Sequence, residues 1–244
     1  MSMFNVDTVG EFLQNNWGYL LGFVLMSAIV GITLRMLSDA RTHSVKVLDE
    51  LLVSNVDLYL QRLRDNRRLR WVFRKSVIEF MMLKGYIAKG DENNALQCIE
   101  NLDKMKLEPQ EKLEFLETRL SFFAQRNSAE QTVASRDMLV DFLKRLKADK
   151  TEKYREIIEE ADAIVKVYIE KDVGFIDNLK QKASVTSHPV VRGVTQYRIA
   201  RLAYHKGDEQ LTKKYLLRAA KNLKGTSFEA TIDSALRDNS VLNQ

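Results

Sequence analysis

The chain has 244 residues, of which 45% are hydrophobic and 29% charged, a balance that is typical of a folded globular protein and excludes a disordered one. It contains only two prolines and ten glycines, and no segment alternates β-branched with polar residues, so the sequence predicts an all-α fold. Cys98 is the only cysteine, which excludes an intrachain disulfide and a cysteine-rich zinc site.

The formal net charge of +5 is concentrated in one part of the chain. Residues 1–34 carry two acidic and no basic side chains, residues 35–75 carry ten basic and five acidic ones, and residues 76–244 carry 28 basic and 26 acidic ones. The basic excess therefore directly follows the first 34 residues.

An apolar segment without a charged residue covers residues 12–34, after a short tail of residues 1–11. A helix of that length measures about 34 Å, which is enough to cross a hydrocarbon core of about 30 Å. We therefore expect a transmembrane helix. A buried core helix would normally show a polar stripe, and a cleaved signal peptide would carry its positive charge before the apolar run.

The charges that flank this segment predict its orientation. Arg35, Arg41 and Lys46 follow it, whereas only carboxylates precede it. By the positive-inside rule, the N-terminus lies outside and the large domain lies in the cytoplasm. We expect a single-pass protein of a bacterial cytoplasmic membrane; a mitochondrial outer-membrane protein with an N-terminal anchor would have a similar sequence.

Residues 35–75 are expected to form a basic juxtamembrane helical connector. Apolar residues recur at spacings of three and four between residues 38 and 65, which predicts one helix there. The sequence leaves open whether this helix continues from the membrane helix or begins after a break at Ser38 or Asp39. The final part of the connector holds seven basic residues: Arg62, Arg64, Arg67, Arg68, Arg70, Arg74 and Lys75.

Three interpretations of this basic segment stay open. It is a solvated helix face whose Leu63, Leu69, Val72 and Phe73 pack on the domain, or it contacts anionic lipid headgroups near the bilayer. In the third interpretation, its arginines neutralise nucleic-acid phosphates while Trp71 stacks on a base.

Downstream, amphipathic segments separated by short polar joints predict a helical domain over residues 76–237, followed by a flexible tail over residues 238–244. Helices joined by two to five residues pack as antiparallel hairpins. The expected helices cover residues 69–89, 94–105, 110–125, 129–148, 151–171, a short stretch between 174 and 184, 190–206, 209–224 and 227–237.

Two of these hairpins share aromatic, small and Gly-Asp turn positions. They are Tyr86, Gly90-Asp91, Ala95 and Ile99 in the first hairpin, and Ile199, Ala200, Tyr204, Gly207-Asp208, Leu216 and Ala219 in the second. These positions resemble the tetratricopeptide repeat family. Leu83 and Thr212 depart from the family's preference for small residues, and the turns lie 117 residues apart, which is not a multiple of about 34 residues. The resemblance implies a degenerate helical-hairpin solenoid that binds proteins. The alternative is an irregular helical bundle in which the two Gly-Asp turns are accidental.

In that family the first helix of each hairpin lines a concave ligand face. Carried onto this sequence, the face contains Phe80, Lys84, Ala88, Tyr197, Arg201 and His205. The resemblance thus implies an acidic or C-terminal peptide as the ligand, because Arg and Lys bind carboxylates. The asparagines with which family members grip a carboxylate are missing. Alternatively, Phe80 and Tyr197 are core residues while Lys84 and Arg201 face water.

No pattern in the sequence indicates catalysis. The three histidines, His43, His188 and His205, lack a metal-binding spacing, and no nucleotide-binding or nucleophile motif occurs. Glu159 and Glu160 lie on a segment rich in Lys and Glu, which is typical of a solvated face. We expect no enzyme and no cofactor, but a membrane-anchored scaffold that binds a protein. The alternative is a nucleic-acid or anionic-lipid binder that acts through the connector.

Overall fold

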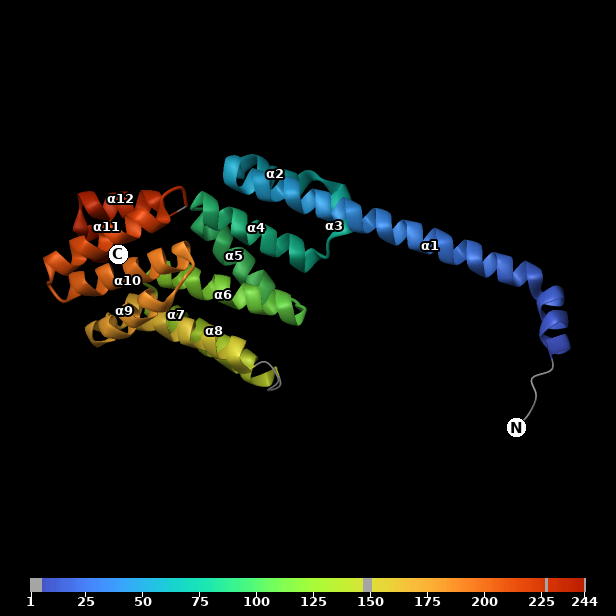
Figure 1. Ribbon diagram of the computed structural model, residues 1–244. Coiled ribbons are helices and arrows are strands. Elements are labelled where there is room, and N and C mark those ends of the chain that lie inside the picture. The colour runs from blue at the N-terminus through green and yellow to red at the C-terminus, as the bar shows by residue number, and fades with distance from the viewer. Residues whose placement is uncertain (1–5, 147–150, 227, 244) are drawn as a thin grey trace, which may run out of the picture. The chain divides into compact units, whose positions relative to one another are not determined.

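The computed structural model describes residues 6–146, 151–226 and 228–243, with side chains from Met26 onward except Ala28 and residues 151–153. Within these ranges the chain is helical and contains no strand, so the all-α prediction is confirmed (Figure 1). The α-helices are α1 (Val6–Ser54), α2 (Val56–Asp65), α3 (Arg67–Val72), α4 (Lys75–Lys89), α5 (Glu92–Asp103), α6 (Pro109–Gln125), α7 (Ala129–Arg145), α8 (Thr151–Ile164), α9 (Ile176–Val185), α10 (Pro189–His205), α11 (Glu209–Leu223) and α12 (Glu229–Arg237). A π-helical turn, η1 (Val165–Ile169), extends α8, and two 3₁₀ turns are η2 (Val173–Phe175) and η3 (Asn239–Asn243).

The chain forms two compact units, residues 1–106 and residues 107–244. The first unit therefore includes α4 and α5, which we expected at the start of a domain over residues 76–237. Gly85 of α4 favours close packing of α4 on α2. A Cβ there would lie 2.6 Å from Leu60 Cδ2, so a larger residue would displace the buried Leu60 side chain. Tyr59 of α2 also donates from its hydroxyl to the carbonyl of Met81, at 2.9 Å.

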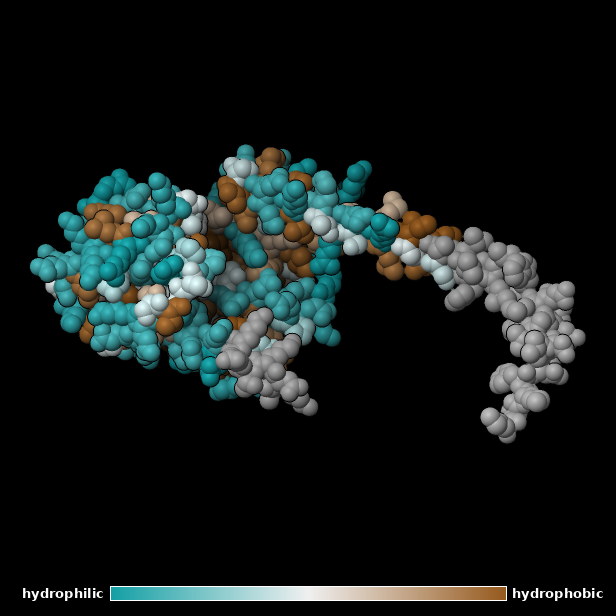
Figure 2. Space-filling model, viewed as in Figure 1, coloured by the Kyte–Doolittle hydropathy of each residue, from teal (hydrophilic) through white to brown (hydrophobic). Residues whose placement is uncertain are grey.

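Among the described side chains, no helix combines the length and the hydropathy that crossing a membrane requires. The transmembrane helix was expected over residues 12–34. The structure does not describe the side chains of residues 12–25 and Ala28, so most of this expectation lies outside the described side chains. On the described part of α1, Figure 2 shows hydrophobic residues gathered away from its contacts with α2 and α3.

The connector differs from the single helix expected over residues 38–65. α1 runs without a break to Ser54, and Asn55 then adopts a non-helical conformation, φ −156° and ψ 87°. Its side chain accepts a hydrogen bond from the amide of Leu58 at 3.0 Å, which caps α2. α2 packs back against α1, and Leu48 and Tyr59 are buried in this hairpin. Tertiary burial thus replaces one continuous helix with two that face each other.

The helix expected over residues 69–89 is also interrupted. Phe73 and Arg74 are extended, with ψ angles of 144° and 155°, and they separate α3 from α4. Phe73 is buried, and the guanidinium carbon of Arg41 in α1 lies 5.7 Å from its ring centroid. The break therefore coincides with docking of the Phe73 side chain against α1.

The hairpins α4–α5 and α10–α11 have the same turn geometry. Gly90 and Gly207 adopt left-handed φ angles of +73° and +77°. A residue with a Cβ would be sterically strained in this conformation. The following Asp91 and Asp208 accept hydrogen bonds from the amides of Asn94 and Leu211 and so cap the second helix of each hairpin. The local chemistry of Gly-Asp thus builds both turns.

In the second unit, α10 is the most deeply buried helix, and it packs on α9 and α11. Gly193 permits the close approach of α11, because a Cβ at this position would lie 2.6 Å from Leu223 Cγ. Residues 239–243, within the segment expected as a flexible tail, form η3, where Leu242 is fully buried in the same core. The apolar Leu242 side chain explains this difference, since its burial stabilises an ordered turn.

Candidate protein-binding cleft

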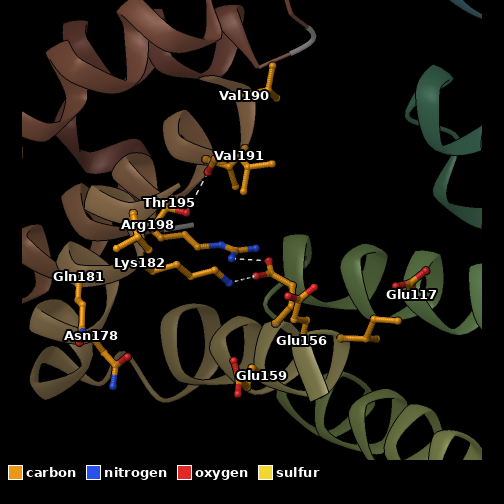
Figure 3. A pocket seen from close by; sticks show the side chains of 14 residues that line it. Glu117, Glu156, Glu159, Asn178, Gln181, Lys182, Val190, Val191, Thr195 and Arg198 are labelled. Atoms are coloured by element: carbon orange, nitrogen blue, oxygen red, sulfur yellow. Dashed lines mark hydrogen bonds and ion pairs between the residues drawn. The ribbon is translucent and has the colours of Figure 1, made fainter. Parts of the chain in front are cut away.

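A cleft of about 850 Å³ opens in the second unit between α8, α9 and α10, with one residue from α6 (Figure 3). It is lined by Glu117, Glu156, Ile157, Glu159, Glu160, Asn178, Gln181, Lys182, Val185, Val190, Val191, Val194, Thr195 and Arg198. A smaller cavity of about 180 Å³ adjoins it and shares Glu117, Ile157, Glu160 and Arg198. The cleft therefore combines an apolar wall with a group of charged side chains.

The apolar wall comes from the joint between α9 and α10. Val185 ends α9 with 77% of its surface exposed, and three further valines, Val190, Val191 and Val194, lie in the first two turns of α10. Pro189 starts α10, where a missing amide proton costs nothing and the fixed φ favours the first turn. The short joint thus holds a cluster of valines at the cleft surface, where their burial by a ligand would be favourable.

An ion-pair network forms the polar side of the cleft. Arg198 of α10 donates from Nη1 to Glu160 Oε1 of α8, and Lys182 of α9 donates from Nζ to Glu160 Oε2 at 2.7 Å (Figure 3). Arg198 has only 6% of its surface exposed. One carboxylate therefore joins three helices around the cleft.

The pKa values in this network follow from burial and charge. Burial raises the pKa of Glu160, but the charges of Arg198 and Lys182 outweigh it, so the pKa lies below its ordinary value. Burial of Arg198 opposes its charged form, but Glu160 and Tyr168 together outweigh that opposition, so the pKa of Arg198 is raised. Both side chains are therefore ionised at neutral pH.

The rest of the charged lining is acidic. Glu117, Glu156 and Glu159 lie around the cleft with Glu160, which gives four carboxylates against the two cations that Glu160 already binds. Glu159 also pairs with Arg155 on its own helix, at 3.6 Å. The lining therefore has a formal charge of −2 beside an apolar wall, an arrangement that suits a basic, partly apolar ligand.

The six expected partner-binding residues are divided between the two units. Phe80, Lys84 and Ala88 lie in the first unit, whereas Tyr197, Arg201 and His205 lie in the second. Phe80 and Tyr197 are buried; Lys84 is exposed with its Nζ 4.5 Å from the Phe80 ring centroid, and Ala88 is exposed. The aromatic residues thus belong to the core, as in the alternative interpretation of this face.

Arg201 does not face water. It has 3% of its surface exposed, stacks over the Tyr168 ring at 4.7 Å and contacts Asn127 Oδ1 at 3.4 Å. His205 is half-buried; burial lowers its pKa, and the charges of Lys171 and Arg201 lower it further. Arg201 therefore supports the packing of α10 instead of presenting a cation to a ligand.

The seven basic residues of the connector, from Arg62 to Lys75, are all exposed, whereas Leu63, Leu69 and Phe73 between them are buried. Val72, the fourth apolar residue of the solvated-face interpretation, is half-buried, and the seven basic side chains are accessible. Trp71 is 88% exposed.

Among the described residues, no group of three or more His, Cys, Asp or Glu side chains is arranged to hold a metal ion. No protein-family model, curated protein or solved structure matches the chain. Sequence reasoning missed the cleft because it assigned Glu159 and Glu160 to a solvated face. The available signal was Arg198, a charged residue between the aromatic and aliphatic side chains of an otherwise buried helix.

Proposed function

We propose that this protein is a membrane-anchored helical adaptor whose second unit binds a segment of a protein partner in the cleft between α8, α9 and α10. The cleft carries the proposal, because it offers solvent-accessible valines beside an acidic lining. Ligand sites commonly combine an apolar surface with a few placed polar groups. The two Gly-Asp hairpins that resemble tetratricopeptide repeats support the same kind of function.

The membrane part of the proposal rests on residues 12–34, which contain no charged side chain, and on the basic residues that follow. The positive-inside rule favours a cytoplasmic position for both units. The adaptor would thereby hold its partner at the membrane without chemistry of its own.

The chemistry of the lining selects the class of partner. Four carboxylates outnumber the cations, and both cations are already paired with Glu160. The carboxylates would repel an acidic peptide. A segment that carries Lys or Arg beside an aliphatic residue would bury the aliphatic side chain on the valines and would place the cation near Glu156 and Glu159. We therefore propose a basic, partly apolar segment as the ligand.

Site-specific photocrosslinking in the native membrane tests this proposal. A photoreactive residue at Val185, inside the cleft, should give a discrete product whose crosslinked segment contains Lys or Arg beside an aliphatic residue. The same residue at Leu217, exposed on α11 and outside the cleft lining, is the matched control.

The charge requirement is tested in the same system. Glu156→Lys with Glu159→Lys should remove the Val185 product, whereas Asp141→Lys with Asp233→Lys, at exposed positions outside the cleft, should leave it. Equal products from Val185 and Leu217, or an acidic crosslinked segment, would overturn the proposed partner class.

A further inference from the structure

Trp71 is the most prominent exposed aromatic residue on the basic connector. It is 88% exposed on α3, although a side chain of this size normally finds a buried position. Its neighbours Arg67, Arg68, Arg70 and Arg74 are exposed as well. Leu69 and Phe73 are buried, which fixes the orientation of α3, so the exposed face is a defined surface and not a mobile segment.

The hairpin in the first unit returns this face toward the start of the connector. α1 continues past Arg41 to Ser54, the chain reverses at Asn55, and α2 and α3 pack back along α1 (Figure 1). Phe73, directly after α3, lies beneath the guanidinium of Arg41. In the sequence, Trp71 is 37 residues beyond Leu34, yet α3 packs on α1, and Phe73, two residues after Trp71, contacts Arg41.

The distance to the end of the apolar segment is short. Arg41 lies seven positions after Leu34 in α1, which corresponds to about 10 Å along a helix. The headgroup region beyond the hydrocarbon core is about 5–8 Å thick on each side, and long side chains extend further. Met36 and Leu37 of α1 are exposed apolar residues within the same interval.

We propose that α3 docks on the surface of an anionic bilayer, with Trp71 in the interfacial layer and Arg67, Arg68 and Arg70 on the lipid phosphates. This proposal rests on the membrane anchor proposed above. Tryptophan favours the interface because its ring is amphipathic, and arginine binds phosphate through paired donors. Asp39 and Asp65 also lie on this part of the connector, but Arg35, Arg41 and the basic residues of 67–75 leave a positive surplus.

A bilayer fits the surface better than a nucleic acid does. Proteins that bind single-stranded nucleic acid without sequence preference stack successive bases on several aromatic side chains. Among the described residues of the connector, Trp71 is the only exposed aromatic residue. The closeness of α3 to the end of the apolar segment is a geometric requirement of the bilayer and irrelevant to a nucleic acid.

The test uses the full chain with Trp17→Phe, so that Trp71 is the single tryptophan, in nanodiscs of phosphatidylcholine with or without phosphatidylglycerol. With the anionic lipid, Trp71 emission should shift to shorter wavelength and should be quenched by lipids with brominated acyl chains. High salt should reverse the shift, because it screens the attraction.

Two triple variants and a single-stranded oligonucleotide serve as the controls. Arg67→Gln with Arg68→Gln and Arg70→Gln should abolish the shift, whereas Lys213→Gln with Lys214→Gln and Lys221→Gln, the same charge change on α11, should preserve it. Circular dichroism checks that both variants keep their helix content. Identical Trp71 emission in both lipids, or an arginine-dependent response to a single-stranded oligonucleotide and not to lipid, would overturn docking.

The same preparation separates failure of the docking from failure of the anchor. A chain that does not co-elute with nanodiscs of either composition lacks the anchor, and both proposals fall. A chain that co-elutes but shows no lipid-dependent emission keeps the anchor and loses only the docking.

Discussion

Arg198 of α10 is almost fully buried, and the carboxylate of Glu160 on α8 neutralises it. We predict that Glu160→Gln lowers the free energy of unfolding by about 1–3 kcal/mol, because the variant leaves a buried guanidinium without its anion. Chemical denaturation of the full chain, followed by circular dichroism, measures this change.

The control for this prediction is Glu159→Gln on the same helix. The Glu159 side chain is 65% exposed and pairs only at the surface, with Arg155, so its loss should cost within about 0.5 kcal/mol. Equal losses from the two variants would show that Arg198 does not depend on Glu160.

The pH dependence of stability follows from the lowered pKa of Glu160. The pKa is lower in the folded state than the ordinary 4.5, so the ion pair stabilises the fold above about pH 4.5 and loses this contribution as pH falls through the folded pKa. The difference in unfolding free energy between wild type and Glu160→Gln should therefore shrink between about pH 6 and pH 3. A difference that stays constant over this range would contradict the prediction. Asp91, Asp177 and Asp238 also have lowered pKa values, but they are common to both proteins and cancel.

Gly193→Ala should destabilise the second unit although alanine favours helices. The new Cβ would meet Leu223 Cγ at 2.6 Å and Asn222 Cβ at 3.0 Å, an overlap that costs about 1–3 kcal/mol and exceeds the gain of about 0.5–1 kcal/mol in helix propensity. Thermal and chemical denaturation measure the loss. Combined with Leu223→Ala, the substitution should cost less than the sum of the two single changes, because the truncated side chain relieves the overlap. Additive losses would show that α11 moves away instead.

The thiol of Cys98 should react slowly in the folded protein. Burial, together with the nearby charge of Glu79, raises its pKa to about 12, so that about one molecule in ten thousand holds a thiolate at pH 8. We predict that a maleimide or a disulfide reagent modifies Cys98 at a rate set by unfolding, with a large acceleration in urea. Fast labelling without denaturant would contradict the burial. Protection of Cys98 in intact cells would accordingly report its burial and not its side of a membrane.

Local sequence chemistry predicted most of the helices after residue 90. The Gly-Asp pairs at residues 90–91 and 207–208 encode a left-handed turn and a helix cap, and both are present in the structure. α11 begins at the expected residue and ends one residue early, because its amphipathic spacing and its cap agree. Such features depend on neighbours within four residues, so they can be read without knowledge of the fold.

The breaks in the connector depend on contacts between distant residues. Asn55 and Asn66 each cap a helix with their side chains. Asparagine favours such caps, but the regular spacing of apolar residues across Asn55 predicted a continuous helix. Phe73 leaves the helical conformation where its ring packs under Arg41, which lies 32 residues earlier. The spacing of apolar residues alone cannot distinguish a long helix from a hairpin with the same buried side chains.

The sequence contained only a partial signal for the cleft. Glu160 and Lys182 lie on helices whose composition is typical of a surface helix, and the position of Arg198 on a buried helix does not say which residues it contacts. Only their contacts across α8, α9 and α10 make them a network. Arg201 shows the same limit. The repeat resemblance placed it on a ligand face and the alternative interpretation placed it in water, whereas its contact with Tyr168 makes it a core residue.

In the docking proposed above, the uninterrupted course of α1 from Leu34 to Arg41 fixes the direction and the depth of α3 relative to the apolar segment, and so restricts how the length of this stretch can vary in evolution. One inserted residue would rotate everything that follows by about 100° about the helix axis and would move it by about 1.5 Å along that axis. An insertion of seven residues would nearly restore the original direction of α3 but would place it about 10 Å further along. Homologous chains that keep the Arg41–Phe73 contact should therefore tolerate substitutions between Leu34 and Arg41 far better than insertions or deletions there.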